Sequence, residues 1–160
     1  MAKFSDLTFK YRLFMKTYKY RSYDWGPGAR MAQPLSESRL AVVTTAAVYS
    51  PDQPPFDESI KGGDVSYRVI PNDTDLSSLL EGHRSAAFDH TGIERDKNLA
   101  LPLDRLRELQ NEGVIGAINA RHFSFMGSVT APGRLTSKTA PEVAGLLQED
   151  QVDAVLLTPV

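Results

Sequence analysis

The sequence predicts an α/β protein of three layers, in which helices cover a mostly parallel sheet of flavodoxin-like character. Three apolar runs rich in branched residues are predicted as core strands, at 39–48, 117–125 and 152–158. Such runs are typical of strands buried on both faces of a parallel sheet. Helical spacing of apolar residues recurs between them, near 74–83, 102–112 and 139–149. Alternating strands and helices are the pattern of βαβ units.

Composition narrows the class of protein. The 160 residues suffice for one core, and 41% hydrophobic and 24% charged residues are ordinary for a globular domain. The net charge of −2 gives no general attraction to nucleic acid. No apolar run is long enough for a bilayer and no signal peptide is visible, so we expect a cytoplasmic protein without membrane or nucleic-acid partners. The absence of cysteine excludes disulfides, thiolate metal sites and a cysteine nucleophile in this chain.

Residues 1–30 are predicted to form an N-terminal amphipathic helix and a linker, and residues 31–160 the α/β domain. Apolar residues at alternating spacings of three and four form one helix stripe, namely Phe4, Leu7, Tyr11, Phe14 and Tyr18. The segment is also basic, with Lys3, Lys10, Arg12, Lys16, Lys19 and Arg21. It fits a helix on a membrane or nucleic acid, or a helix packed on the domain with its charges in solvent. We favour the packed helix because aromatic stripes usually bury their rings.

The first predicted core strand ends in two hydroxyl side chains. Thr44 and Thr45 stand at the carboxyl end of this strand, where open parallel sheets bind their ligands. The hydroxyls fit a ligand site, and they fit equally a cap on the following turn.

A long loop at 49–63 leads into a strand predicted to be half exposed. Val65, Tyr67 and Val69 alternate with Asp64, Ser66 and Arg68. Asp64 and Arg68 therefore share a face, which suits holding a carboxylate or orienting the loop. The alternative is a surface ion pair of little energetic consequence.

The middle of the chain holds the predicted helices 74–83 and 102–112. Asp73 or Thr74 can cap the first, and His83 continues its apolar face, so this histidine is either a core residue or a ligand. A short strand at 86–88 is predicted to end at Asp89. Pro102 suits the first turn of the second helix, which Gly113 can end.

The last third is predicted as strand, helix and strand. His122 and Ser124 alternate with Phe123 and Phe125 near the end of the first strand. Thr139 to Glu142 matches a capping box for helix 139–149. The final strand, 152–158, is predicted to be fully buried.

No local motif decides the chemistry. The glycine-containing segments lack the context of a phosphate loop, and HExxH and a nucleophile elbow are absent. His83, Asp89, His90 and His122 match no known metal-ligand spacing, so a metal-assisted hydrolase is the weakest hypothesis.

An ordered set of short segments resembles the selenoprotein B family of glycine, sarcosine, betaine and D-proline reductases, with its short members the closer match. The segments are 39–45, Gln53-Pro54-Pro55-Phe56-Asp57, 62–71, His83, Phe88-Asp89, Asp96-Lys97-Asn98, 102–106, His122-Phe123-Ser124-Phe125-Met126-Gly127 and 152–160. The resemblance implies reductive cleavage of a C–N bond in a small-molecule substrate. A dithiol/disulfide couple is then the electron partner: a thiol- or selenol-bearing donor protein supplies the electrons, and a disulfide is left as the oxidised product.

The resemblance also implies where the redox group stands. In the family, selenocysteine or cysteine, two residues and a cysteine follow the strand that 152–160 resembles. The catalytic residues are thus expected directly after Val160, and the chain itself holds no catalytic residue and no cofactor. A selenocysteine codon is also a stop codon, so we expect UGA at this point of the gene. An exposed sheet edge at this strand would favour a homo-oligomer.

The candidate substrate-binding residues implied by matching positions are Thr44, Thr45, Asp64, Arg68, His83, Asp89, Asn98 and His122. Arg68 would hold a substrate carboxylate, and His122 or His83 would transfer protons. A non-catalytic small-molecule-binding or assembly subunit is the alternative hypothesis.

Overall fold

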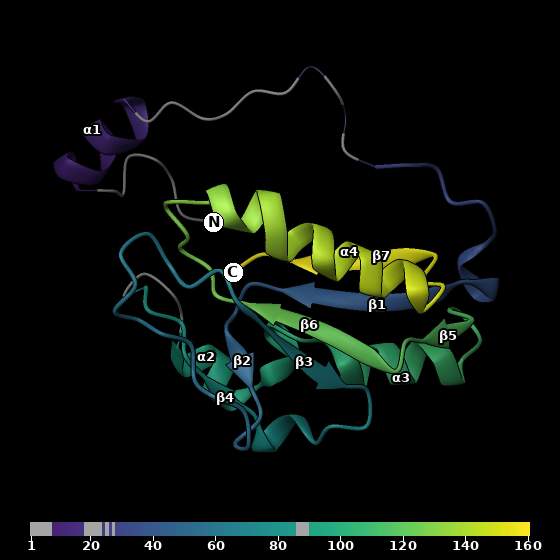
Figure 1. Ribbon diagram of the computed structural model, residues 1–160. Coiled ribbons are helices and arrows are strands. Elements are labelled where there is room, and N and C mark those ends of the chain that lie inside the picture. Colours follow the sequence, from purple (N-terminus) through teal and green to yellow (C-terminus); the bar gives the residue numbers. More distant parts are fainter. Residues whose placement is uncertain (1–7, 18–23, 25, 27, 86–89) are drawn as a thin grey trace. The chain divides into compact units, whose positions relative to one another are not determined.

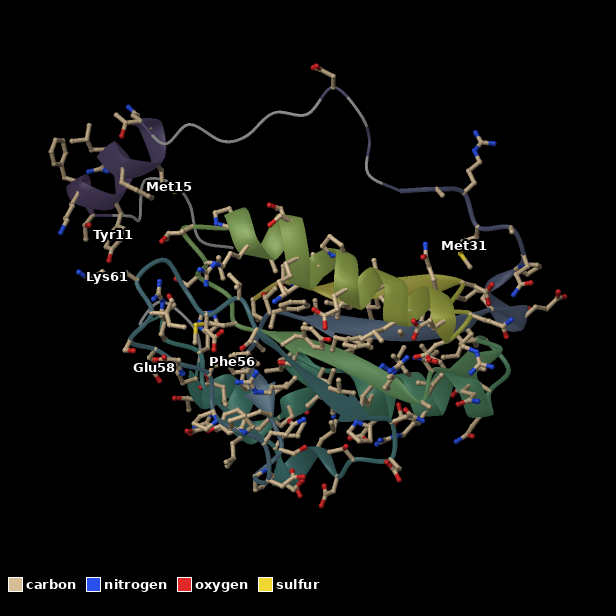
Figure 2. All side chains as sticks on the ribbon, viewed as in Figure 1. Tyr11, Met15, Met31, Phe56, Glu58 and Lys61 are labelled. Atoms are coloured by element: carbon tan, nitrogen blue, oxygen red, sulfur yellow. The ribbon has the colours of Figure 1, made fainter. Side chains whose placement is uncertain are left out.

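The computed structural model describes residues 8–17, 24, 26, 28–85 and 90–160 (Figure 1). The chain divides into two compact units, Met1–Arg30 and Met31–Val160. The first contains α1 (Phe9–Thr17), in which no residue is buried, and Figure 2 labels Tyr11 and Met15 on it. The predicted N-terminal helix is thus present, while its packing on the domain stays a prediction.

The main sheet is built around β1 (Arg39–Thr44). On one side β1 pairs directly and in parallel with two strands, with β5 (Ala117–Ile118) at its start and with β6 (Arg121–Phe125) at its end. On the other side it pairs in parallel with β7 (Ala154–Thr158). β3 (Tyr67–Pro71) pairs antiparallel with β6. The sheet is therefore mostly parallel, with β3 and β7 as its two edges.

Helices lie on both faces of this sheet, as Figure 1 shows. α4 (Ala140–Glu149) packs Val143 and Leu147 against Ala41, Phe123 and Phe125 on one face. The opposite face carries α2 (His90–Arg95) and α3 (Leu103–Asn111), with Leu103 and Leu106 in a core cluster with Leu40 and Val42. The predicted three layers are confirmed, and the flavodoxin-like character stays a prediction.

Short elements complete the domain. β2 (Val48–Tyr49) and β4 (Leu80–Glu81) form a small antiparallel sheet of their own. Single 3₁₀ turns occur at Leu35–Glu37, Leu76–Ser78 and Lys97–Leu99. A π-helical turn, Leu135–Thr139, precedes α4 directly.

Two of the predicted core strands are shorter than expected. The strand predicted at 39–48 ends at Thr44, because Ala47 adopts a φ of 53° and a left-handed residue cannot continue a strand. The strand predicted at 117–125 is split into β5 and β6 by residues 119–120.

The predicted helix 74–83 is wrong. Asp75, rather than Asp73 or Thr74, caps a single 3₁₀ turn through the Ser77 N–H at 2.9 Å. Leu80 then pairs across β4 with Tyr49. Cross-strand pairing and an early cap outweigh a helical apolar spacing this short.

The predicted capping box at Thr139 is also wrong. Thr139 has helical φ and ψ of −73° and −33° and makes no side-chain cap bond. The π turn before it already supplies helical backbone, so no N-cap is formed there. The helix itself agrees with the predicted 139–149.

β7 is parallel as predicted, but the prediction of full burial is wrong. Val155, Leu156 and Leu157 are 38%, 37% and 67% exposed. Among the described residues β7 pairs only with β1, so its outer edge is bare.

In the part of the chain that the structure describes, no helix has the length and apolarity to cross a membrane.

Candidate functional site

The parallel strands end in a row of polar side chains. Thr44 of β1 is in register with Ser124 of β6 and with Thr158 of β7, and Ser124 is in register with Arg68 of β3. Residues in register point to the same face of a sheet. Arg68, Ser124, Thr44 and Thr158 therefore form one row, the polar row, on the face that α2 and α3 cover.

The two threonines of the polar row use their hydroxyls within the protein. Thr44 Oγ1 accepts from the Ala46 N–H at 3.2 Å and donates to the Thr158 carbonyl at 3.3 Å. Thr158 Oγ1 donates to the Ala100 carbonyl at 2.7 Å. Both hydroxyls hold the strand ends together. Thr44 also caps the following turn, which is one of the two alternatives predicted for it.

Thr45 sits just beyond the row and joins the ends of β1 and β7. Its Oγ1 accepts from the Val160 N–H at 3.0 Å, and its own N–H donates to the Thr158 carbonyl at 3.2 Å. Thr44 is fully buried and Thr45 is partly exposed. The two threonines predicted from the strand end thus lie together at the carboxyl edge.

Arg68 is buried and directs its N–H groups at neighbouring protein atoms. Nε and Nη2 donate to the carbonyls of Pro54 and Pro55 at 2.8 and 3.0 Å, and Nη1 donates to the Ser66 hydroxyl at 2.9 Å and the Tyr67 carbonyl at 3.0 Å. The guanidinium also stacks over the Phe56 ring, 4.3 Å from its centroid; Figure 2 labels Phe56. These contacts make Arg68 an anchor for the loop of residues 53–57, the 53–57 loop.

Asp64 anchors the same loop from the other side. Its carboxylate accepts from the Asp57 N–H at 2.9 Å and from the Ser66 N–H at 2.8 Å. Burial alone would raise the pKa of the Asp64 carboxyl, but hydrogen bonds from Asp57 and Ser66 outweigh it and lower the pKa. Of the uses predicted for Asp64 and Arg68, these bonds realise loop orientation, while contact with substrate stays a prediction.

His83 lies at the same carboxyl edge. A Cβ atom at Gly127 would collide with His83 Nε2 and would lie 2.9 Å from the Thr45 carbonyl, so only glycine leaves room for the ring. His83 Nδ1 accepts from the Ser85 N–H at 3.2 Å, which leaves the ring proton on Nε2. Burial lowers the pKa of His83, in keeping with a neutral ring.

A second histidine, His90, has its pKa shifted in the opposite direction to that of His83. His90 Nδ1 lies 2.6 Å from Glu81 Oε2, and His90 Nε2 lies 3.1 Å from the Ser85 carbonyl. With acceptors at both nitrogens, the ring is favoured as the cation, and the hydrogen bond to Glu81 raises the pKa of His90. Glu81 also accepts from the His83 N–H. Glu81, Ser85 and the two histidines therefore form one network, the 81–90 network.

His122 is enclosed in the sheet. Its Nδ1 accepts from the Val42 N–H at 3.0 Å, and its Nε2 lies 3.3 Å from Asn72 Oδ1. The ring takes the place of a backbone carbonyl where the strand breaks between β5 and β6. Burial, with a smaller effect of the Arg107 charge, lowers the pKa of His122 to about 4. The ring is fully buried. Its predicted part in proton transfer stays a prediction.

Asn98 has a different position from the polar row. Its Oδ1 accepts from the Asp104 N–H at 3.0 Å and its Nδ2 donates to Asp104 Oδ2 at 2.9 Å, which caps the start of α3. It lines a polar pocket of about 310 Å³ together with residues of the Leu76–Ser78 turn and α3. Asp89 lies outside the described residues. Among the described residues no group of three metal-ligating side chains is assembled.

Three functional candidates escaped the sequence analysis. Ser124 and Thr158 belong to the polar row, and the alternation of Ser124 with Phe123 and Phe125 was the signal available. Glu81 was missed because nothing in the predicted helix 74–83 indicated the pairing in β4 that brings it to His90.

This arrangement is that of an open α/β sheet, and such sheets bind ligands at the carboxyl ends of their parallel strands. The chain belongs to the glycine/sarcosine/betaine reductase selenoprotein B family, whose sequence profile matches residues 5–160. The family predicted from the short segments is therefore confirmed.

Curated relatives agree with this family. D-proline reductase subunit gamma of Acetoanaerobium sticklandii is 34% identical over 134 residues, which are 84% of this chain and 52% of that protein. Glycine reductase complex component B subunit gamma of Symbiobacterium thermophilum is 30% identical, over 88% of this chain and 33% of that protein. Betaine reductase complex component B subunit beta of Peptoclostridium acidaminophilum is 30% identical, over 78% of this chain and 28% of that protein.

The chain spans about half the length of the first of these relatives and about a third of the others. No solved structure matches the chain.

Proposed function

We propose that these residues form the substrate-binding N-terminal part of a selenoprotein B-like reductase component. The reaction is reductive cleavage of a C–N bond in a small amino acid or its N-methylated derivative. The relatives are named for the reduction of D-proline, glycine and betaine, and two are named as components of complexes. A protein partner that exchanges electrons through a dithiol and a disulfide is part of the proposal.

The observation that carries this proposal is the carboxyl edge itself. Hydroxyls from three parallel strands lie at the strand ends. His83, whose pKa is lowered by burial, and His90, whose pKa is raised by Glu81, belong to the 81–90 network, in which His83 approaches Gly127 and the Thr45 carbonyl at this edge. Hydroxyl donors suit a carboxylate, and an imidazolium suits protonation of a departing amine. In this proposal Arg68 and Asp64 position the 53–57 loop.

The redox group of the proposed reaction comes from outside residues 1–160. The chain has no cysteine, and thiol–disulfide exchange requires a thiolate or selenolate as nucleophile. We propose a selenocysteine or cysteine presented at the carboxyl edge, as the family resemblance implies.

Isothermal titration calorimetry with glycine, sarcosine, betaine and D-proline tests the proposal, with L-proline as the matched control for D-proline. We expect saturable heat with at least one of the four and less with the mirror-image compound. Absence of binding by all four would remove the substrate-site proposal.

A second candidate is a non-catalytic small-molecule-binding or assembly subunit, which the lack of cysteine favours. Sequencing the gene beyond codon 160 separates the candidates. An in-frame selenocysteine or cysteine codon followed three positions later by a cysteine supports the reductase, and its absence supports the second candidate.

A further inference from the structure

Ser124 is the member of the polar row whose hydroxyl has no hydrogen-bond partner in the part of the chain that the structure describes. The residue is 0% exposed, and its Oγ makes no hydrogen bond with the described residues. Thr139 Oγ1, at the start of α4 on the opposite face of the sheet, is a comparable hydroxyl among the described residues. A buried hydroxyl without a partner is destabilising, so an unpaired donor in a native protein calls for a ligand, water or ion.

The neighbours of Ser124 in the row are engaged with other atoms. Thr44 Oγ1 has its donor on the Thr158 carbonyl and receives the Ala46 N–H. Arg68 directs Nε, Nη1 and Nη2 at Pro54, Pro55, Ser66 and Tyr67. Within the described row, Ser124 is therefore the hydroxyl that still has a proton to donate, and it stands at the edge where open α/β sheets bind ligands.

We propose that the Ser124 hydroxyl donates a hydrogen bond to the carboxylate of the substrate; this inference rests on the proposed function. The substrates in the relatives' names share only one group that accepts a hydrogen bond. Betaine carries a quaternary nitrogen with neither a proton nor a lone pair, whereas glycine, D-proline and betaine all carry a carboxylate. The substrate class is thus a small carboxylate with nitrogen on the neighbouring carbon, and a charged acceptor strengthens the bond from Ser124.

Calorimetry on the 160-residue chain tests this role with Ser124→Ala, and with Thr139→Ala as the matched control. The ligands are glycine, sarcosine, betaine, D-proline and, as a carboxylate-free probe, glycinamide. We expect Ser124→Ala to weaken carboxylate binding about tenfold or more, because hydrogen bonds to charged groups contribute about 1.5–3 kcal/mol. Thr139→Ala leaves the affinity unchanged, and glycinamide binds both forms equally.

Thermal melting distinguishes a ligand contact from a buried water. Removing an unpartnered hydroxyl leaves Tm unchanged or raises it, so a loss of affinity at unchanged Tm supports the proposal. An unchanged affinity in Ser124→Ala overturns it, whatever happens to Tm. Should Ser124→Ala not fold, Ser124→Cys, which retains the volume with a weaker donor, is held to the same criteria. If the unmodified chain binds none of the four carboxylates, the proposed function itself fails before any variant is compared.

Discussion

The two edge strands of the sheet, β3 and β7, are protected in opposite ways. β3 is covered by the 53–57 loop, since Gln53 Nε2 donates to the Val69 carbonyl at 2.8 Å and Arg68 binds the Pro54 and Pro55 carbonyls. Among the described residues β7 has no such cover, and Leu157, next to the last residue of the strand, is 67% exposed. The sequence predicts the reverse, because β3 alternates polar and apolar residues and β7 is an unbroken apolar run.

The difference teaches that an edge is protected by side chains arriving from elsewhere. Arg68 can be buried in an edge strand because a loop supplies carbonyls for its N–H groups. Val155 and Leu157 stay 38% and 67% exposed because the described chain covers them only in part. A strand's own pattern therefore predicts that it is a strand, and does not predict what covers it.

The largest effect expected comes from comparing the sheet interior with the β7 edge at one register position. Val42, fully buried, is paired with Leu156, which is 37% exposed. Val42→Asp buries an unpaired charge and should cost more than about 4 kcal/mol, whereas Leu156→Asp should cost less than about 1 kcal/mol. Urea unfolding followed by circular dichroism measures both, and equal losses would contradict the description of β7 as an exposed edge.

The next effect concerns pH on the β3 side of the sheet, where His122 is paired with Ile70. Since the folded-state pKa of about 4 lies below the ordinary 6.5, the unfolded chain takes up the proton first as pH falls. This stability is fully present above pH 6.5 and is lost toward pH 4, a loss of about 3 kcal/mol. In His122→Gln this decrease in the free energy of unfolding between pH 6.5 and pH 4 should be absent. Urea unfolding at a series of pH values measures the decrease in both proteins. A slope identical in both proteins would rule out the neutral buried ring.

A smaller effect is expected from weakening the cover over β3. Arg68→Lys loses the planar fork that binds two carbonyls at once, so unfolding should become easier by about 1–2 kcal/mol. Limited proteolysis should then cut the 53–57 loop faster. Arg105→Lys is the control, because that side chain is 60% exposed in an ion pair with Glu108. If both variants behave alike, Arg68 is not the anchor of the loop.

The smallest change in stability is expected at the bare edge. Leu157→Lys should alter the free energy of unfolding by less than about 0.5 kcal/mol, but a charge on an exposed edge strand opposes pairing with another chain. Light scattering should therefore show concentration-dependent association of the unmodified chain that decreases in Leu157→Lys. Leu99→Lys, at a residue that is 62% exposed in the Lys97–Leu99 turn and belongs to no strand, serves as the control. A chain that stays monomeric at every concentration would contradict this prediction.

The sequence was sufficient for elements whose apolar pattern is complete. α3 and α4 have full apolar faces and agree with the predicted ranges. The helix predicted at 74–83 failed because Leu76, Leu79 and Leu80 suit two structures, and pairing with Tyr49 is a contact distant in sequence. The break between β5 and β6 was equally out of reach, because it accompanies a contact between residues distant in sequence, the bond from the Val42 N–H to the His122 ring.

The candidate site was predictable where position along a strand decided it. Thr44 and Thr45 followed from the end of an apolar run, and both lie at the carboxyl edge. Glu81 could not be found, because its importance depends on meeting His90 across a loop. The loop-anchoring use of Arg68 needed the Pro54 and Pro55 carbonyls, which no spacing within the strand reveals.

The bond between the Val42 amide and His122 Nδ1 links two nitrogen atoms. A hydrogen bond of this kind transmits a scalar coupling between the two nuclei, so isotope labelling would make it visible in a magnetic resonance spectrum as a direct connection between neighbouring strands. Protonating the ring nitrogen removes the acceptor and with it the coupling. One amide in the middle of the sheet thus serves as an internal reporter of how β1 and β6 are joined.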